Sequence, residues 1–226
     1  MTTSAGGRVR EHRRLSVAVL AGGRSTRMRS DKAFLSLNGR SFISIIADEA
    51  SRVSSDVLVV IGGKEKERFR ADLGARARIV NDSHRLGTPL GGMLTAFETF
   101  TDGYAAVVAC DAPLIKGEVL EALNESAASR SAAVPLWETG RMEPLCSVYD
   151  VREARKASLS AISTGRVRCI DMVSLLPDVN FVPVSDLRPI DAALGSLVNV
   201  NTPEEFRALE HLSEVSPGAS RLRSDE

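Results

Sequence analysis

The chain has 226 residues, which is enough for one large α/β domain or two small ones. Hydrophobic residues make up 43% and charged residues 26% of the chain, as in soluble globular proteins. Lys plus Arg equals Asp plus Glu at 29 each, and aromatic residues are only 4%, so the composition argues against a nucleic-acid-binding protein.

The cysteines Cys110, Cys146 and Cys169 are sparse and odd in number, which favours a reducing compartment, the cytoplasm. They form no C-x-x-C pattern and most simply pack as small hydrophobic residues. No apolar run approaches the roughly 20 residues of a membrane helix, so we expect no membrane partner. The Gly- and Arg-rich residues 1–14 lack a signal-peptide core, and we expect them to form a flexible tail.

The first predicted element is a buried strand at 17–20, which leads into Gly22 and Gly23. Glycine lets a ligand approach backbone N–H groups, which can line an anion-binding concavity. Positive charge follows within ten residues, at Arg24, Arg27, Arg29 and Lys32. This loop suits a polyphosphate, although a polar loop with solvated charges also explains it. Neither G-x-x-x-x-G-K-[ST] nor G-x-G-x-x-G is present, so a P-loop or dinucleotide fold is not supported.

Strands and helices then alternate at short spacing. A turn is expected at Asn38-Gly39, and Ser41 can cap the first helix. We expect strands at 57–61, 77–80 and 105–109, and helices at 41–52, 64–70, 93–100 and 118–128. The alternation predicts an α/β fold with a mostly parallel twisted sheet and helices on both faces.

The second part of the chain is less regular. We expect strands at 132–136, 146–149, 181–184 and 196–200, and helices at 151–157 and 166–176. A last helix begins after Thr202, which is followed by Pro203 and two acidic residues. No linker requires two independent domains, so we expect one domain over residues 15–212 and a flexible polar tail at 213–226.

Polar residues follow several of the predicted strands. Asp111 is placed to hold a hard cation, and Mg²⁺ takes one or two carboxylates together with phosphate oxygens and water. Asp-Ala-Pro is equally a good turn sequence, so Asp111 could simply form a turn. Asp82 likewise could either cap its loop or contact the nucleotide. Asn199 and Asn201 are two residues apart, so within a strand they would face the same side.

The segment L-A-G-G-x-S-x-R-M-x-x-D-K-A at Leu20–Ala33 resembles the signature of the molybdenum cofactor guanylyltransferases. These enzymes belong to a larger group of nucleotidyltransferases with a Rossmann-like sheet, of the nucleotide-diphospho-sugar transferase type. Arg29 stands where the family usually has glycine. The resemblance spans about Ser16–Arg207 and implies a nucleotide-binding part at about 15–130 and an acceptor part at about 131–212.

The resemblance implies roles for individual residues. Arg27, Lys32 and Asp111 would be catalytic, and Asp111 with Asn201 would hold Mg²⁺ as cofactor. The nucleotide would be bound by Leu20, Ala21, Gly22, Gly23, Lys32, Asp82, Pro89, Leu90, Gly91 and Asp111, where Thr88 departs from the family's G-P-L-x-G segment. The acceptor would meet Arg141, Pro144, Arg166 and Asn199. Arginines in polar loops such as Arg141, Arg166 and Arg168 are more often solvated, and Trp137 fits a core or surface position as well as a pterin contact.

The implied reaction transfers GMP from GTP to molybdopterin, the molybdenum cofactor, and forms the guanine dinucleotide cofactor and pyrophosphate. Positioning and charge neutralisation would suffice, because a phosphate monoester is already ionised near neutral pH. The resemblance also implies contact with other cofactor-biosynthesis proteins or molybdoenzymes. Two alternatives stay open: a related enzyme that uses CTP or another acceptor, and a GTP-binding protein that has lost catalysis.

Overall fold

The structure, a computed structural model, describes residues 14–22, 31–63, 65–84 and 86–215. Most of the two expected tails lies outside these ranges, so the tails stay a prediction. Among the described residues, no helix combines the length and the apolar character that crossing a membrane requires.

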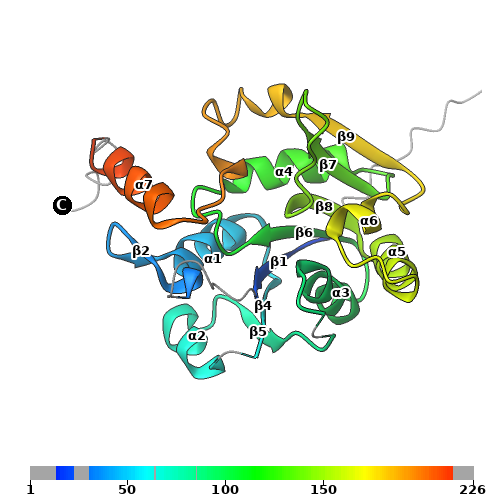
Figure 1. The fold of residues 1–226 in the computed structure, drawn as a ribbon, viewed down its shortest axis with the longest axis horizontal. Coiled ribbons are helices and arrows are strands. Elements are labelled where there is room, and N and C mark those ends of the chain that lie inside the picture. Colours follow the sequence, from blue (N-terminus) through cyan, green and yellow to red (C-terminus); the bar gives the residue numbers. More distant parts are fainter. Residues whose placement is uncertain (1–13, 23–30, 64, 85, 216–226) are drawn as a thin grey trace, which may run out of the picture.

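A seven-stranded sheet runs through the centre of the protein in the order β5-β4-β1-β6-β8-β7-β9 (Figure 1). Its strands are β1 Leu15–Ala21, β4 Val57–Ile61, β5 Arg78–Asn81, β6 Tyr104–Ala109, β7 Ala132–Leu136, β8 Cys146–Asp150 and β9 Val179–Pro183. Only β8, among these strands, runs antiparallel to its neighbours β6 and β7. The prediction of a mostly parallel α/β sheet is therefore confirmed.

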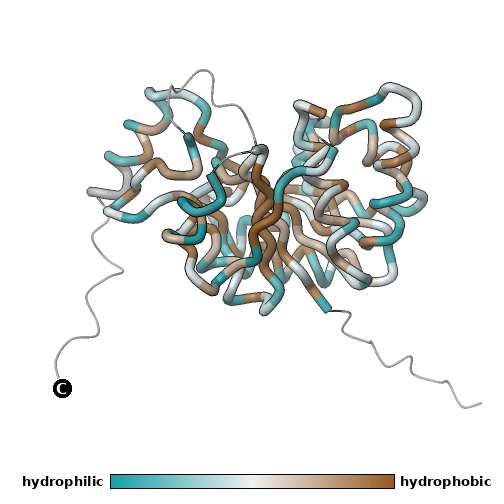
Figure 2. The backbone as a smooth tube through the Cα atoms, turned by 90° about the horizontal axis from the view of Figure 1, so that it is seen from below, coloured by the Kyte–Doolittle hydropathy of each residue, from teal (hydrophilic) through white to brown (hydrophobic). Residues whose placement is uncertain are grey.

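Helices cover both faces of the sheet because the strands are apolar on both sides. Along β1, Val17 and Val19 pack with α1 Phe42–Val53, α2 Lys66–Leu73 and α4 Gly117–Ser126. The alternate residues Ala18 and Leu20 pack with α3 Pro89–Thr99, α5 Val151–Ser163 and α6 Cys169–Val173. Figure 2 shows the result as an apolar central sheet with polar segments outside it.

The short elements also follow local sequence. Asn38 and Gly39 both adopt positive φ, at 52° and 76°, and close the hairpin of β2 Ser36–Leu37 and β3 Arg40–Ser41 as expected. Ser41 Oγ accepts from Ser44 N–H at 3.1 Å, which confirms it as the N-cap of α1. Thr202 Oγ1 accepts from Glu205 N–H at 3.2 Å at the start of α7 Pro203–Val215, which confirms the last cap.

Two predicted elements are wrong. Residues 196–200 are not a strand: a 3-10 helix, η3 Gly195–Leu197, follows Leu194, whose φ of 53° turns the chain. The predicted helix at 166–176 shrinks to α6, because the chain turns at Gly165 and Arg168 becomes an N-cap held by the Asp171 carboxylate. Two further 3-10 helices are η1 Lys32–Phe34 and η2 Val184–Leu187.

Candidate active site

The carboxyl ends of β1, β4, β5 and β6 meet at one edge of the sheet because these strands are parallel. Gly22, Gly62, Asp82 and Asp111 each lie just beyond the end of one of them. Open α/β sheets bind ligands at this edge. The topology therefore brings Gly22, Asp82 and Asp111, which are predicted to contact the nucleotide, to a common side of the protein.

Lys32, Asp111 and Asn201 form the centre of this edge. Lys32 Nζ donates to Asp111 Oδ2 at 2.9 Å and to Asn201 Oδ1 at 2.7 Å. The Lys32 and Asp111 side chains are only 15% and 20% exposed, so solvent screens their ion pair less than a surface pair. Three segments far apart in the chain thus place one ammonium and two oxygens together, as expected for Lys32 and Asp111.

Backbone contacts hold these segments in place. Val200 N–H donates to the Asp111 carbonyl at 2.8 Å, which fixes the chain next to Asn201 on the end of β6. Cys110 N–H donates to the Leu20 carbonyl at 3.1 Å, which ties the end of β6 to the end of β1. The side chains of the cluster are therefore positioned by the main chain of β1 and β6.

Gly22 and Gly62 lie against each other where β1 and β4 end. A Cβ atom on Gly62 would overlap the Gly22 carbonyl oxygen and lie 2.9 Å from its carbonyl carbon. Glycine is thus required at position 62 by close backbone approach, a role that the sequence did not reveal although Gly62 ended a predicted strand. Gly23, Arg24, Arg27 and Arg29 lie outside the described residues, so their expected roles stay predictions.

Asp82 is fixed at the start of α3. Its Oδ1 accepts from His84 N–H at 2.9 Å and from Thr95 Oγ1 at 3.1 Å. A Cβ atom on Gly91 would lie 3.0 Å from Asp82 Oδ2, so the missing side chain of Gly91 leaves room for the carboxylate. Pro89 occupies the first turn of α3 and Leu90 is buried in the core. The structure thus places Asp82 against the Pro89–Gly91 segment, a contact that the sequence did not predict.

The loop between β7 and β8 presents a second cluster, around Trp137. The Arg141 guanidinium lies over the Trp137 ring at 4.6 Å from its centroid and contacts Glu143 Oε1 at 2.9 Å. Trp137 Nε1 donates to the same Glu143 oxygen at 2.7 Å. The half-buried Pro144 is next in the loop, and its carbonyl accepts from Tyr149 Oη at 2.8 Å. Glu143, which orients both larger side chains, had no role in the sequence interpretation.

The other expected acceptor residues are more scattered. Arg166 is exposed, and Arg168 bonds the Asp171 carboxylate at 2.8 Å. The Arg168 hydrogen bonds lower the pKa of Asp171 against the opposing effect of burial. Asn199 is exposed in a segment that is not a strand, and its carbonyl accepts from Asn201 Nδ2 at 3.4 Å. The expectation that Asn199 and Asn201 share a strand face is therefore wrong.

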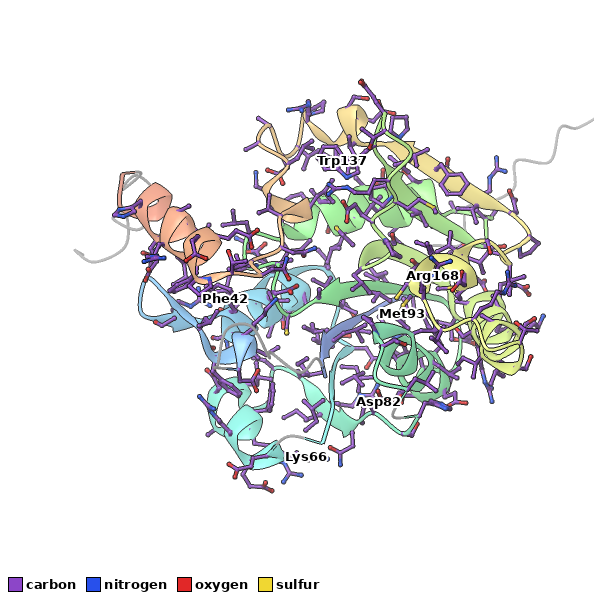
Figure 3. The ribbon with its side chains drawn as sticks, viewed as in Figure 1. Phe42, Lys66, Asp82, Met93, Trp137 and Arg168 are labelled. Atoms are coloured by element: carbon purple, nitrogen blue, oxygen red, sulfur yellow. The ribbon has the colours of Figure 1, made fainter. Side chains whose placement is uncertain are left out.

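The two clusters lie along the same edge of the sheet. β7 is parallel to β6, since both are antiparallel to β8, so Trp137 follows β7 at the edge where Asp111 follows β6. Asp82 and Trp137 lie toward opposite ends of this edge in Figure 3. Five strand spacings of roughly 4.8 Å separate β5 from β7, which places these two strands about 24 Å apart. The Lys32–Asp111–Asn201 cluster lies between them.

Two cysteines are unsuited to act as nucleophiles. Burial, followed by the charges of Glu143 and Asp191, raises the pKa of Cys146 to about 12. Burial likewise raises the pKa of Cys169 to about 11. Both thiols stay protonated near neutral pH and pack as small hydrophobic groups, as expected.

The donor set at the centre fits a hard cation. Asp111 and Asn201 offer a carboxylate and an amide oxygen, the ligand types that hard cations take, and in this structure one oxygen of each accepts a hydrogen bond from Lys32 Nζ. Over the described ranges no three His, Cys, Asp or Glu side chains gather, so a metal here would take further ligands from phosphate and water.

The chain is similar to known nucleotide transferases. Residues 17–171 match the family model described as the MobA-like NTP transferase domain. A probable molybdenum cofactor guanylyltransferase from Methanothermobacter thermautotrophicus is 36% identical over 197 residues, which cover 85% of this chain and 97% of that protein. One from Methanosarcina acetivorans is 32% identical and covers 86% of this chain and 89% of that protein.

Solved structures of related proteins have the same fold. Molybdopterin-guanine dinucleotide biosynthesis protein A from Archaeoglobus fulgidus has a TM-score of 0.75 at 28% identity, covering 88% of this chain and 99% of that one. The 2-C-methyl-D-erythritol 4-phosphate cytidylyltransferase of Thermus thermophilus has a TM-score of 0.66 at 19% identity, covers 89% of this chain and 99% of that one, and shares the fold. The chain therefore belongs to the MobA-like NTP transferase family and is a nucleotidyltransferase.

Proposed function

We propose that this protein transfers GMP from GTP to molybdopterin, forming the guanine dinucleotide cofactor and pyrophosphate. The observation that carries the proposal is the convergence of Lys32, Asp111 and Asn201 at the carboxyl edge of the sheet. The similarity to a probable molybdenum cofactor guanylyltransferase and to a molybdopterin-guanine dinucleotide biosynthesis protein supports the nucleotide and the acceptor.

Lys32 and the Gly22 loop supply the triphosphate site in this proposal. The Lys32 ammonium is fixed by two oxygens at 2.9 and 2.7 Å, so it needs little reorganisation to stabilise charge that develops on the leaving pyrophosphate. Arg27, which lies outside the described residues, is proposed to add to this charge. Leu20 and Ala21 at the end of β1 bring the loop to the edge.

Asp82 is proposed to select the base. Its carboxylate is held by His84 N–H and Thr95 Oγ1 at the Pro89–Gly91 helix start. Guanine offers two adjacent N–H donors on one edge, which suit a carboxylate with two acceptor oxygens. Buried or oriented polar groups discriminate strongly against a base that leaves them unpaired.

Asp111 and Asn201 are proposed to hold Mg²⁺. Held by these two residues, the metal would supply positive charge that offsets the negative charge of the phosphates. Asp111 supplies the charged oxygen and Asn201 the neutral one, and the Val200–Asp111 backbone bond keeps the two at a fixed separation.

The acceptor is proposed to bind at the β7–β8 loop, toward Arg141 and Pro144, with Arg166 and Asn199 as further contacts. The Trp137 ring and the Arg141 guanidinium combine a flat apolar surface with a positive charge. Such a pair suits a fused ring that carries a phosphate. The buried Cys146 and Cys169 thiols support a cytoplasmic location for the reaction.

The test is a reconstituted reaction of the purified protein with molybdopterin, MgCl₂ and either GTP or CTP. We expect pyrophosphate release with GTP and a product of the mass of the guanine dinucleotide. Turnover with CTP alone would identify a cytidylyl transferase instead. GTP binding without turnover would identify a nucleotide-binding protein, and the absence of binding to either nucleotide would overturn the proposal entirely.

A further inference from the structure

The segment that carries Asn201 has no strand to hold it. Figure 1 shows it in orange, running from the end of β9 past α4 to α7. It reaches the loop after β6 by hydrogen bonds: Val200 N–H bonds the Asp111 carbonyl at 2.8 Å, and Lys116 N–H bonds Ser196 Oγ at 3.1 Å. Gly195 also packs on Leu114, since a Cβ there would lie 3.3 Å from Leu114 Cβ.

Asp191 lies at the centre of these contacts. Its Oδ2 accepts from Ser196 N–H at 2.7 Å, and its Oδ1 lies 3.2 Å from Lys116 Nζ. Its carbonyl accepts from Leu194 N–H at 2.8 Å, which closes the turn that leads into η3. The Asp191 side chain is only 4% exposed. One buried carboxylate therefore joins its own segment to the loop after β6.

Ser196 and Lys116, the two partners of Asp191, also contact each other, so that the three residues form one connected hydrogen-bond network. Lys116 Nζ donates to the Ile190 carbonyl at 3.2 Å, and the Lys116 backbone N–H donates to Ser196 Oγ. Ser196 lies five residues before Asn201, and Lys116 lies five residues after Asp111. The directional bonds of a buried, paired carboxylate fix the register of two loops in a way that apolar contact alone does not.

We infer that Asp191 is a positioning residue: through Ser196 and Lys116 it holds Asn201 at bonding distance from Asp111 and thereby sets the metal affinity of the nucleotide site. Asp191 does not touch metal or nucleotide. This inference rests on the proposed function of Asp111 and Asn201 and adds a residue that the family resemblance did not supply.

The test measures Mn²⁺ binding in the presence of GTP by electron paramagnetic resonance, together with the melting temperature and hydrogen exchange of the Val200 amide. The variants are Asp191→Ala, Asp191→Asn and Ser196→Ala. Asp178→Ala is the matched control, because it also removes one partner of an ion pair, with Arg130 at 2.7 Å, but at the opposite edge of the sheet.

We expect Asp191→Ala to raise the Mn²⁺ dissociation constant about tenfold, the lower end of the range for residues that orient metal ligands. Asp191→Asn keeps an acceptor for Ser196 N–H and should give a smaller rise, as should Ser196→Ala. Exchange of the Val200 amide should become faster in Asp191→Ala, and Asp178→Ala should change neither quantity.

If the wild type binds Mn²⁺ and the folded Asp191 and Ser196 variants bind it with the same affinity, the inference about Asp191 is overturned. The proposed function is not affected by that result. If Asp191→Ala does not fold, the Asp191→Asn and Ser196→Ala variants decide in the same way. A wild-type protein that binds no Mn²⁺ with GTP would instead overturn the proposed function and, with it, the inference.

Discussion

At the residue scale, the position of Asp111 combines two separate roles. Its carboxylate contacts Lys32 Nζ, whereas its carbonyl accepts from Val200 N–H. The side chain is therefore available for chemistry while the main chain maintains the loop. This separation allows the two roles to be tested by a substitution that changes the carboxylate and leaves the backbone in place.

We predict that Asp111→Asn lowers kcat/KM for Mg²⁺-dependent transfer by about 100-fold or more, in the range for loss of one preorganised charge-stabilising group. The melting temperature should stay within a few degrees of wild type because the Val200 bond uses the backbone. Steady-state pyrophosphate release and thermal unfolding measure the two effects. Full activity in Asp111→Asn would contradict the assignment of the metal site.

Ser41 tests a local interaction far from the reaction. We predict that Ser41→Ala lowers the free energy of unfolding by about 1 kcal/mol, because Ser44 N–H loses its cap and Asp72 loses the hydrogen bond from the Ser41 hydroxyl. Chemical denaturation measures the change. Ser51→Ala on the exposed side of the same helix is the control and should be neutral. Equal losses in the two variants would show that the cap contributes nothing specific.

At the element scale, the ends of β1 and β4 form a paired glycine corner, defined here as Gly22 and Gly62. Neither strand could end this close to the other with a side chain at position 62. The strands are adjacent and in register from Val17 with Val57 to Ala21 with Ile61, so the two loops leave the sheet side by side. The packing of two elements therefore decides where the proposed triphosphate loop begins, at Gly22.

We predict that Gly62→Ala lowers the free energy of unfolding by about 1–3 kcal/mol, the range for overpacking, and raises KM for GTP. The reason is the overlap of its Cβ with the Gly22 carbonyl. Denaturation curves and initial rates check both effects. Gly92→Ala is the control for stability, since its Cβ would meet Leu20 Cδ2 at an ordinary 3.4 Å. Unchanged stability in Gly62→Ala would contradict the close approach.

At the scale of the whole molecule, the sheet places the proposed base, triphosphate and acceptor sites along one edge. Asp82, which we propose selects the base, follows β5, the Lys32–Asp111–Asn201 cluster follows β1 and β6, and the Trp137 cluster follows β7. Among the described strands, β8 alone is antiparallel to its neighbours; it lies between β6 and β7, so that the β7–β8 loop, the proposed acceptor site, begins at the same edge as Asp111.

Acid stability is a property of the whole molecule that Asp191 helps to set. Burial opposes the ionisation of Asp191, but hydrogen bonds from Ser196 and the Lys116 charge outweigh it and lower the pKa. A carboxyl with a lowered folded pKa stabilises the protein above its unfolded pKa of about 3.9 and loses this contribution as the pH falls further.

We therefore predict that the melting temperature falls as the pH is lowered from about 5 to 3, the region just around the ordinary Asp pKa. Asp191→Asn should have a flatter profile there, since it has no proton to take up. Scanning calorimetry across this range compares the two proteins. If the melting temperatures of the wild type and Asp191→Asn fall equally between about pH 5 and 3, Asp191 does not contribute to acid stability.

The sequence determined the family, the alternation of strands and helices, and the polar residues at strand ends. Apolar runs such as 57–61 and the caps at Ser41 and Thr202 are local signals, since neighbouring residues produce them. The motif around Gly22 and Lys32 is also local, and it led directly to the nucleotidyltransferase resemblance.

Only the tertiary structure decided which distant residues meet. Asn201 reaches Lys32 because η3 replaces the strand expected at 196–200, and Asp191 fastens that turn from within the core. The approach of Gly62 to Gly22 likewise depends on the pairing of β1 with β4. Such contacts join residues many positions apart, and no periodicity or local propensity encodes them, because their free energy arises only when the sheet has formed.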